Sequence, residues 1–149
     1  MSNYPVWWED TITIYNKYTD PQTQVVTWYR TVIENQCFWK YDRNKVMIGE
    51  VVLETNRTIC RIPQNDKFLE RYQWEQLFND VMEDYFTLSQ GDIIVKGAVD
   101  DEIDEYAKGH RSSDLLTKYK ALQGCIEISS VSINTKKGTN NKHYLVIGD

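Results

Sequence analysis

The chain has 149 residues, of which 41% are hydrophobic and 26% charged, a composition typical of one soluble globular domain and not of collagen-like or disordered chains. Seventeen basic residues against twenty-two acidic ones give a net charge of −5. A general nucleic-acid binder carries a basic surface that displaces counterions from phosphate, so this balance argues against that class. The sequence contains neither an apolar run long enough to span a bilayer nor an N-terminal secretion signal. We therefore expect a single domain over residues 1–149 with no membrane partner.

The first third of the chain predicts antiparallel strands. Residues 10–18 alternate between polar and β-branched or aromatic side chains, which is the period of a half-buried strand. Residues 19–23 supply turn chemistry through an aspartate followed by a proline. Residues 25–33 then alternate again, so a hairpin is expected.

The next segment is expected to leave the strand and return to it. Cys37–Trp39 closes the second strand, and the polar segment 40–46 predicts a loop. Strand character resumes over residues 49–62, with a bend at Asn56–Arg57 that would divide it into two strands.

The remaining elements are short. The spacing of apolar residues favours a helix over about 74–82, and residues 92–96 read as a brief apolar strand. Ser112 or Ser113 is expected to cap a helix over 114–120.

The chain ends with a predicted hairpin of residues 125–133 and 143–147, joined by a turn over 136–141. Six to seven short antiparallel strands with one or two short helices indicate a mainly β fold, a small β-barrel or sandwich.

Searches for catalytic motifs find no nucleophile elbow, phosphate loop, dinucleotide fingerprint or zinc-protease helix. The three cysteines, Cys37, Cys60 and Cys125, are far apart and odd in number, which argues against a disulfide framework or paired metal ligands and favours a reducing compartment. A Cys–His pair of Cys125 with His110 or His143 would generate a nucleophile, but a buried cysteine and surface histidines explain the same residues. We expect no catalytic residue, no metal site and no cofactor.

The densest acidic segment consists of Asp100, Asp101, Glu102, Asp104 and Glu105. Several carboxylates could hold a calcium ion, but the spacing lacks the glycine and final glutamate of an EF-hand loop. A solvated acidic loop is the simpler interpretation. Such a loop would repel a nearby phosphate backbone.

Aromatic residues are unusually frequent, with five tryptophans and ten tyrosines. Such residues are favoured at protein–protein contacts, although a large aromatic core would explain them equally well. Trp7 and Trp8 precede the first expected strand, where we predict a docking segment over residues 1–9 that contacts other subunits.

Several strings of strand character follow one another in a fixed order along the chain. They are Thr11–Asn16, Tyr29–Ile33, Phe38–Trp39, Arg61–Pro63, Tyr85–Gly97, Ile128–Val131 and His143–Gly148. In order and spacing they resemble the head-closure (stopper) connector proteins of long-tailed bacteriophages and of prophages in Gram-positive bacteria. The resemblance covers most of the chain and is weakest over residues 66–83 and 100–120.

This resemblance implies a β-barrel subunit of the virion, assembled in the host cytoplasm, that forms a ring of six or twelve copies. The ring would lie between portal or adaptor proteins and the tail-terminator protein, and would retain packaged DNA, which passes through without specific binding. In that family the loop after the second strand projects into the channel. Here that loop corresponds to Lys40, Tyr41, Asp42, Arg43, Asn44, Lys45 and Val46.

Two other functions stay open. One is another connector or tail-terminator ring protein, either of a phage or of a phage-tail-like particle. The other is a small β-barrel module that binds a small molecule or glycan through its aromatic side chains.

Overall fold

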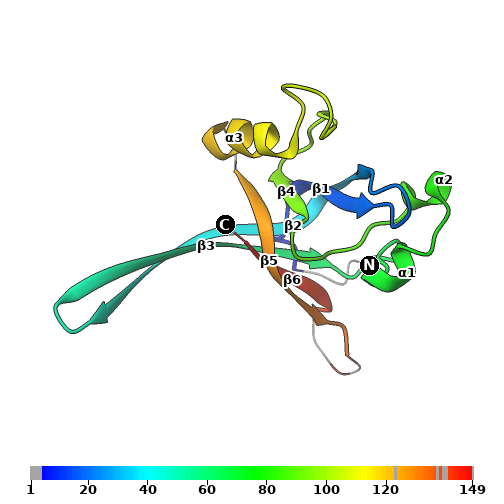
Figure 1. Ribbon diagram of the computed structural model, residues 1–149. Coiled ribbons are helices and arrows are strands. Elements are labelled where there is room, and N and C mark those ends of the chain that lie inside the picture. The colour runs from blue at the N-terminus through cyan, green and yellow to red at the C-terminus, as the bar shows by residue number, and fades with distance from the viewer. Residues whose placement is uncertain (1–4, 123, 137, 139–140, 149) are drawn as a thin grey trace.

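The computed structural model describes residues 5–122, 124–136, 138 and 141–148, without the side chains of 42–46, 53–56, 79 and 122. In this part of the chain, six strands and three short helices follow one another (Figure 1). The strands form a closed barrel in the order β1-β2-β3-β6-β5-β4, and every neighbouring pair is antiparallel. The predicted mainly β fold, a small barrel with short helices, is confirmed.

The first hairpin joins β1 (Asp10–Thr19) to β2 (Val26–Ile48). Its turn is set by Asp20, whose Oδ1 accepts hydrogen bonds from the backbone N–H groups of Gln22 (2.8 Å) and Thr23 (3.2 Å). The aspartate side chain thus mimics a backbone turn, as the sequence predicted.

The pairing of β1 with β2 is interrupted by a bulge. Thr11 alone lies between the paired residues Asp10 and Ile12 on β1, whereas three residues of β2, 34–36, lie opposite it. Within the bulge Asn35 adopts a left-handed backbone, with φ of 56°, and its N–H donates to Thr11 Oγ1 (3.0 Å). Such a bulge bends its strand and changes its direction.

Beyond the bulge, β2 continues as a strand, and the loop predicted for residues 40–46 is wrong. β3 (Val51–Pro63) pairs with β2 without interruption from Phe38 opposite Arg61 to Ile48 opposite Val51, so the predicted bend at Asn56–Arg57 is also absent. The loop was predicted because residues 40–46 are polar. A two-stranded ribbon with water on both faces has no buried face, so its sequence need not alternate between apolar and polar residues. The turn lies instead at residues 49–50, where Gly49 has a φ of 63°.

The helical segment after β3 differs from the single helix predicted over 74–82. It consists of α1 (Arg71–Trp74) and α2 (Asn79–Met82). Phe78 between them has an extended backbone, and its side chain is exposed. This break allows Trp74 and Met82 both to be buried.

The last helix, α3 (Ser112–Leu122), is longer than predicted and begins differently. The N–H of Ser112 donates to Glu105 Oε1 (2.9 Å), and the N–H of Arg111 donates to Asp114 Oδ2 (3.1 Å). Carboxylates therefore satisfy these amides, not the serine hydroxyls that we expected, and negative charge suits a helix N-terminus.

The remaining strands are β4 (Ile93–Lys96), β5 (Cys125–Asn134) and β6 (His143–Gly148), and β5 and β6 form the predicted hairpin. The turn predicted over 136–141 lies partly outside the described residues.

Two apolar clusters stabilise the barrel. The first fills its interior with side chains from all the strands, including Ile12, Ile62 and Val146. The second lies outside, where α3 and residues 99–103 cover Tyr15 of β1, Ile93 and Val95 of β4, and Cys125 of β5. In the described part of the chain, no helix has the length and apolar character needed to cross a membrane.

Candidate functional site

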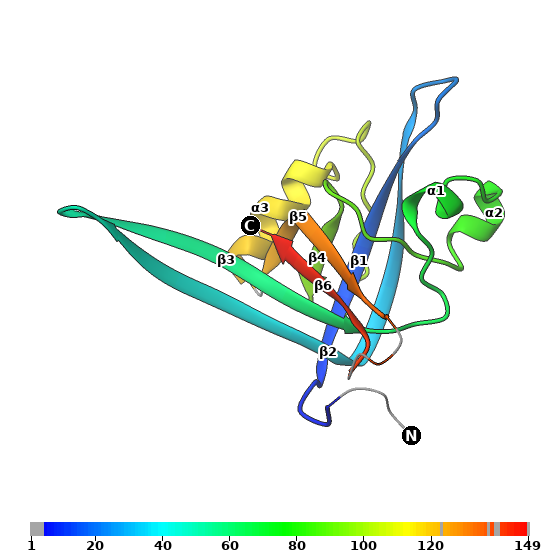
Figure 2. The same ribbon diagram turned by 90° about the horizontal axis from the view of Figure 1, so that it is seen from below.

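The most prominent surface feature is a two-stranded ribbon formed by residues 40–57, here called the arm (Figures 1 and 2). β1 pairs with β2 only up to Cys37, and β6 pairs with β3 only from Thr58 onward. The arm therefore extends away from the barrel, and no other strand in the described part of the chain lies along its outer edges. At about 3.4 Å per residue, its nine residues of β2 reach about 30 Å from the barrel.

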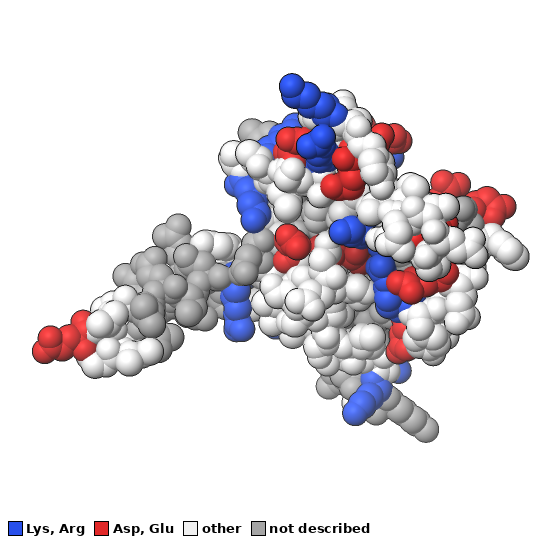
Figure 3. All heavy atoms as spheres, in the orientation of Figure 1, with Lys and Arg blue, Asp and Glu red and all other residues white. Residues whose placement is uncertain are grey.

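The far end of the arm, here called the tip, is apolar. Met47, Ile48, Val51 and Val52 are paired across the two strands, and 53–70% of each side chain is exposed. The described tip is mostly uncharged in Figure 3, with an acidic group at its end. Because an isolated two-stranded ribbon is only marginally stable in water, exposed apolar groups at its end indicate a surface that meets another protein.

The residues predicted to form a channel loop lie along β2 within the arm. Lys40 and Tyr41 are exposed, and the side chains of 42–46 lie outside the described residues. The predicted segment is therefore a strand of the arm and not a loop, and the prediction did not include the apolar tip. A glycine between two apolar runs, around residue 49, was the signal of a hairpin turn.

The two N-terminal tryptophans have different environments. Trp7 is 62% exposed and lies edge-on to Phe38, with ring centroids 5.3 Å apart. Trp8 is buried, stacks on Phe38 and meets the edge of His143. Trp7 thus lies on the surface, whereas Trp8 packs against the base of the arm and β6. Their predicted contact with other subunits stays a prediction.

The acidic segment is a loop, as predicted, but several of its carboxylates hold the fold together. Asp101 accepts hydrogen bonds from Lys118 Nζ (2.8 Å) and Tyr119 Oη (2.9 Å), and the bond from Lys118 lowers the pKa of Asp101. Glu105 accepts from Trp28 Nε1 as well as from the start of α3.

Two further members of the acidic segment have local contacts. Asp100 Oδ1 lies 3.4 Å from Arg30 Nη1, and Asp104 Oδ1 accepts a hydrogen bond from the backbone N–H of Tyr106. Glu102 is exposed. Among the described residues, no group of acidic, histidine or cysteine side chains is arranged to hold a metal ion.

The surroundings of the Cys125 thiol do not favour a nucleophilic Cys–His pair. Cys125 is buried in the outer apolar cluster, and this burial raises its pKa to about 12. A thiolate is therefore disfavoured. His143 instead lies against Trp8 and hydrogen bonds with the carbonyl of Asn141, while His110 is exposed.

Comparison with known proteins gives one match. No curated protein and no solved structure matches the chain. A family model described as a family of unknown function (DUF6751) matches residues 7–149, a range that includes every strand and helix, the arm and the acidic segment. The chain therefore belongs to the family DUF6751.

Proposed function

We propose that the protein is a structural subunit of a phage head–tail interface, which forms a ring that closes the DNA channel and joins the portal or adaptor to the tail. The observation that carries this proposal is the arm with its exposed apolar tip. A barrel anchored in a ring wall can direct such an arm toward the central axis, where the copies meet.

The chemistry of the tip changes the closing mechanism expected from the sequence. A loop of mixed charge would close by ion pairs between Lys40, Asp42, Arg43 and Lys45 of neighbouring subunits. An apolar tip closes instead by contact between Met47, Ile48, Val51 and Val52 of several copies, which removes apolar surface from water. Such contacts have no attraction for phosphate, and Glu50 in the turn repels it, so DNA slides past once the tips separate.

The charge distribution of the barrel supports the same role. Acidic and basic groups alternate on the face shown in Figure 3, without a continuous basic stripe. A conduit with such a lining does not retain DNA by counterion release. The same features also suit the alternative of another connector or tail-terminator ring protein, which would use the arm to join neighbours without closing the channel.

The decisive experiment shortens the arm in the phage or prophage that encodes the protein. Tyr41 and Thr58 are paired, so Asn-Gly in place of residues 42–57 closes a two-residue hairpin at the barrel. We expect the barrel to fold and rings to assemble, while filled heads lose their DNA before tails attach, as measured by nuclease sensitivity of the packaged genome.

A matched variant separates tip chemistry from arm length. Changing Ile48 and Val51 to threonine keeps the ribbon and removes apolar surface at one cross-strand pair. We expect partial DNA loss from these heads. Heads that keep their DNA with the shortened arm contradict the closing role, and normal DNA retention combined with failed tail joining would favour the connector alternative.

A further inference from the structure

One strand edge of the barrel is unpaired close to the first hairpin. β2 pairs with β1 over residues 26–37, but its pairing with β3 begins only at Phe38. The N–H of Val26 points away from β1 and donates to Tyr106 Oη (3.0 Å). Because backbone groups alternate in direction along a strand, those of Trp28 and Arg30 point to the same side. No described residue forms a backbone hydrogen bond to them, so this edge can accept another strand.

A groove of about 590 Å³ runs along this edge between the acidic segment and α2. Trp28, Tyr29 and Tyr106 supply its aromatic surface. Its charged groups are mostly acidic, with Glu83, Glu102 and Asp104 in the lining. Such a groove selects an extended segment that carries basic side chains.

The one basic group in the lining is already engaged. Arg30 Nη1 donates to the carbonyl of Val99 (2.6 Å) and lies 3.4 Å from Asp100. Its charge is therefore directed toward this chain's own acidic segment, and the groove keeps a net negative character.

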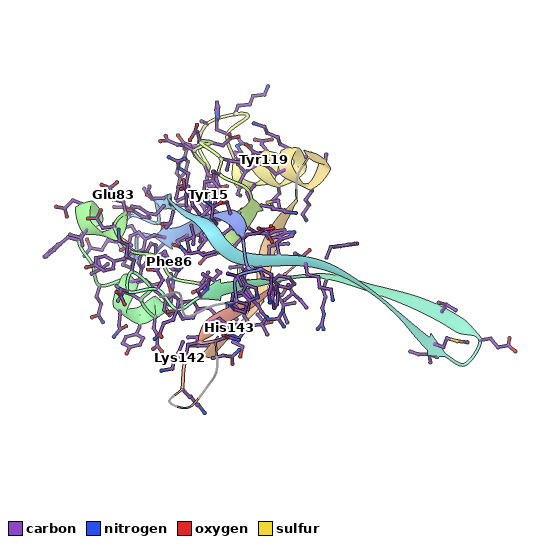
Figure 4. All side chains as sticks on the ribbon, turned by 180° about the vertical axis from the view of Figure 1, so that it is seen from behind. Tyr15, Glu83, Phe86, Tyr119, Lys142 and His143 are labelled. Carbon is purple, nitrogen blue, oxygen red and sulfur yellow. The ribbon has the colours of Figure 1, made fainter. Side chains whose placement is uncertain are left out.

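A segment that complements the groove lies at the other end of the same chain. Residues 128–148 contain three lysines and one histidine and no acidic residue. Lys136 is exposed and Lys142 half-buried at the end of the β5–β6 hairpin. Figure 4 shows Lys142 and His143 at the opposite end of the barrel from Tyr15 and Glu83.

We infer that the groove of one copy binds the β5–β6 hairpin of a second copy, in a head-to-tail contact. Lys136 and Lys142 meet Glu83, Glu102 and Asp104. Both edges of β6 are already paired, but β5 pairs with β4 only over Cys125–Glu127, so the outer edge of β5 beyond this point pairs with the open edge of β2. Two different surfaces at opposite ends of the molecule make a heterologous contact, which closes into a ring when the rotation between copies allows it. This inference deepens the proposed ring assembly and rests on it for the identity of the partner.

Two charge reversals test the contact in the purified full-length protein. One variant carries Glu83→Lys and Glu102→Lys, and the other carries Lys136→Glu and Lys142→Glu. We expect wild-type protein to self-associate in a salt-dependent way, and each variant alone to associate at least about tenfold more weakly, by sedimentation equilibrium. An equimolar mixture of the two variants should regain association, since each groove then meets a hairpin of opposite charge.

A matched control makes the same change of net charge elsewhere. Asp66 and Glu70 are exposed and lie outside both the groove lining and the β5–β6 hairpin, so Asp66→Lys with Glu70→Lys should associate like wild type. Circular dichroism checks that all variants keep the β fold.

Three results would overturn the inference. They are a wild-type protein that stays monomeric, a groove variant that associates like wild type, and a mixture that fails to recover. Rings that persist in the groove variant would refute this contact without contradicting the proposed ring function. That function is tested separately, by DNA retention in heads with the shortened arm.

Discussion

Asp92 gives the sharpest test of the energetics of this fold. Its side chain is 1% exposed and lies where the barrel meets α1. Oδ2 accepts hydrogen bonds from Asn16 Nδ2 (2.9 Å) and the N–H of Ser89 (3.1 Å), Oδ1 accepts from the N–H of Lys17 (3.0 Å), and Arg71 Nη1 lies 3.7 Å away. Burial outweighs these favourable contacts and raises the pKa of Asp92 from 3.8 to about 6.

The sign of the pH effect follows from this shift. Between the unfolded pKa of 3.8 and the folded pKa of about 6, the folded protein holds a proton on Asp92 that the unfolded chain releases. The contribution of Asp92 to the free energy of unfolding is therefore fully present below the unfolded pKa and is lost as pH rises through the folded one. From about pH 5 to about pH 7.5 the loss is about 1 kcal/mol.

The variant Asp92→Asn removes this titration. We expect the free energy of unfolding of wild type, minus that of the variant, to increase by about 1 kcal/mol when pH falls from about 7.5 to about 5, as measured by urea unfolding of dilute protein. The two proteins also differ in free energy of unfolding by a pH-independent amount, because the amide cannot make all the hydrogen bonds of the carboxylate. Only the change of this difference with pH therefore tests the pKa shift of Asp92.

The control is Ser129→Ala, at an exposed position without a titratable group, which should show no such change with pH. A difference between wild type and Asp92→Asn that stays the same at both pH values would refute the reasoning. It would mean that the contacts with Arg71 and the three donors keep the carboxyl ionised.

Two further predictions concern packing and are measured by thermal or urea unfolding. Trp8→Ala should lower the free energy of unfolding by about 3–5 kcal/mol because it leaves a cavity at a buried site. Trp7→Ala, at an exposed site, should lower it by less than about 1 kcal/mol. Equal effects of the two substitutions would contradict the different burial of the two rings. Gly148→Ala should cost about 2 kcal/mol because its new Cβ would lie 2.5 Å from the carbonyl oxygen of Glu127. Ser129→Ala, exposed on β5, is the control, and a Gly148→Ala protein as stable as this control would show that β5 and β6 separate without cost.

Strands with one face in the barrel could be predicted from the sequence. Ile12 and Ile14 lie in the barrel interior and alternate with Thr13 and Tyr15, which are buried on the opposite face, and β6 likewise alternates between buried and half-buried residues. The arm could not be predicted as strand, because polarity without alternation is shared by loops and by ribbons exposed on both faces. Its strand structure is fixed by cross-strand pairing along the whole ribbon, from Phe38 opposite Arg61 to the turn.

The candidate surfaces were predicted only where they are local in sequence. The segment 40–46 and the two tryptophans are each a single stretch of residues, which a local pattern can single out, and their proposed roles stay predictions. The groove joins an edge of β2, the acidic segment and Glu83, which are far apart along the chain, so no local pattern could indicate it. The acidic segment was found, but the bonds from Lys118 and Tyr119 that engage Asp101 depend on the docking of α3.

The bulge at Asn35 lies just before the arm leaves the barrel, and this position makes it a pivot. Met47 in the tip lies twelve residues or about 40 Å further along β2, so a rotation of about 10° at the bulge would displace the tip by about 7 Å. That displacement is larger than the spacing of about 4.8 Å between two paired strands. The hydrogen bonds between Thr11 and Asn35 hold the bulge in place and therefore fix the direction in which the arm leaves the barrel.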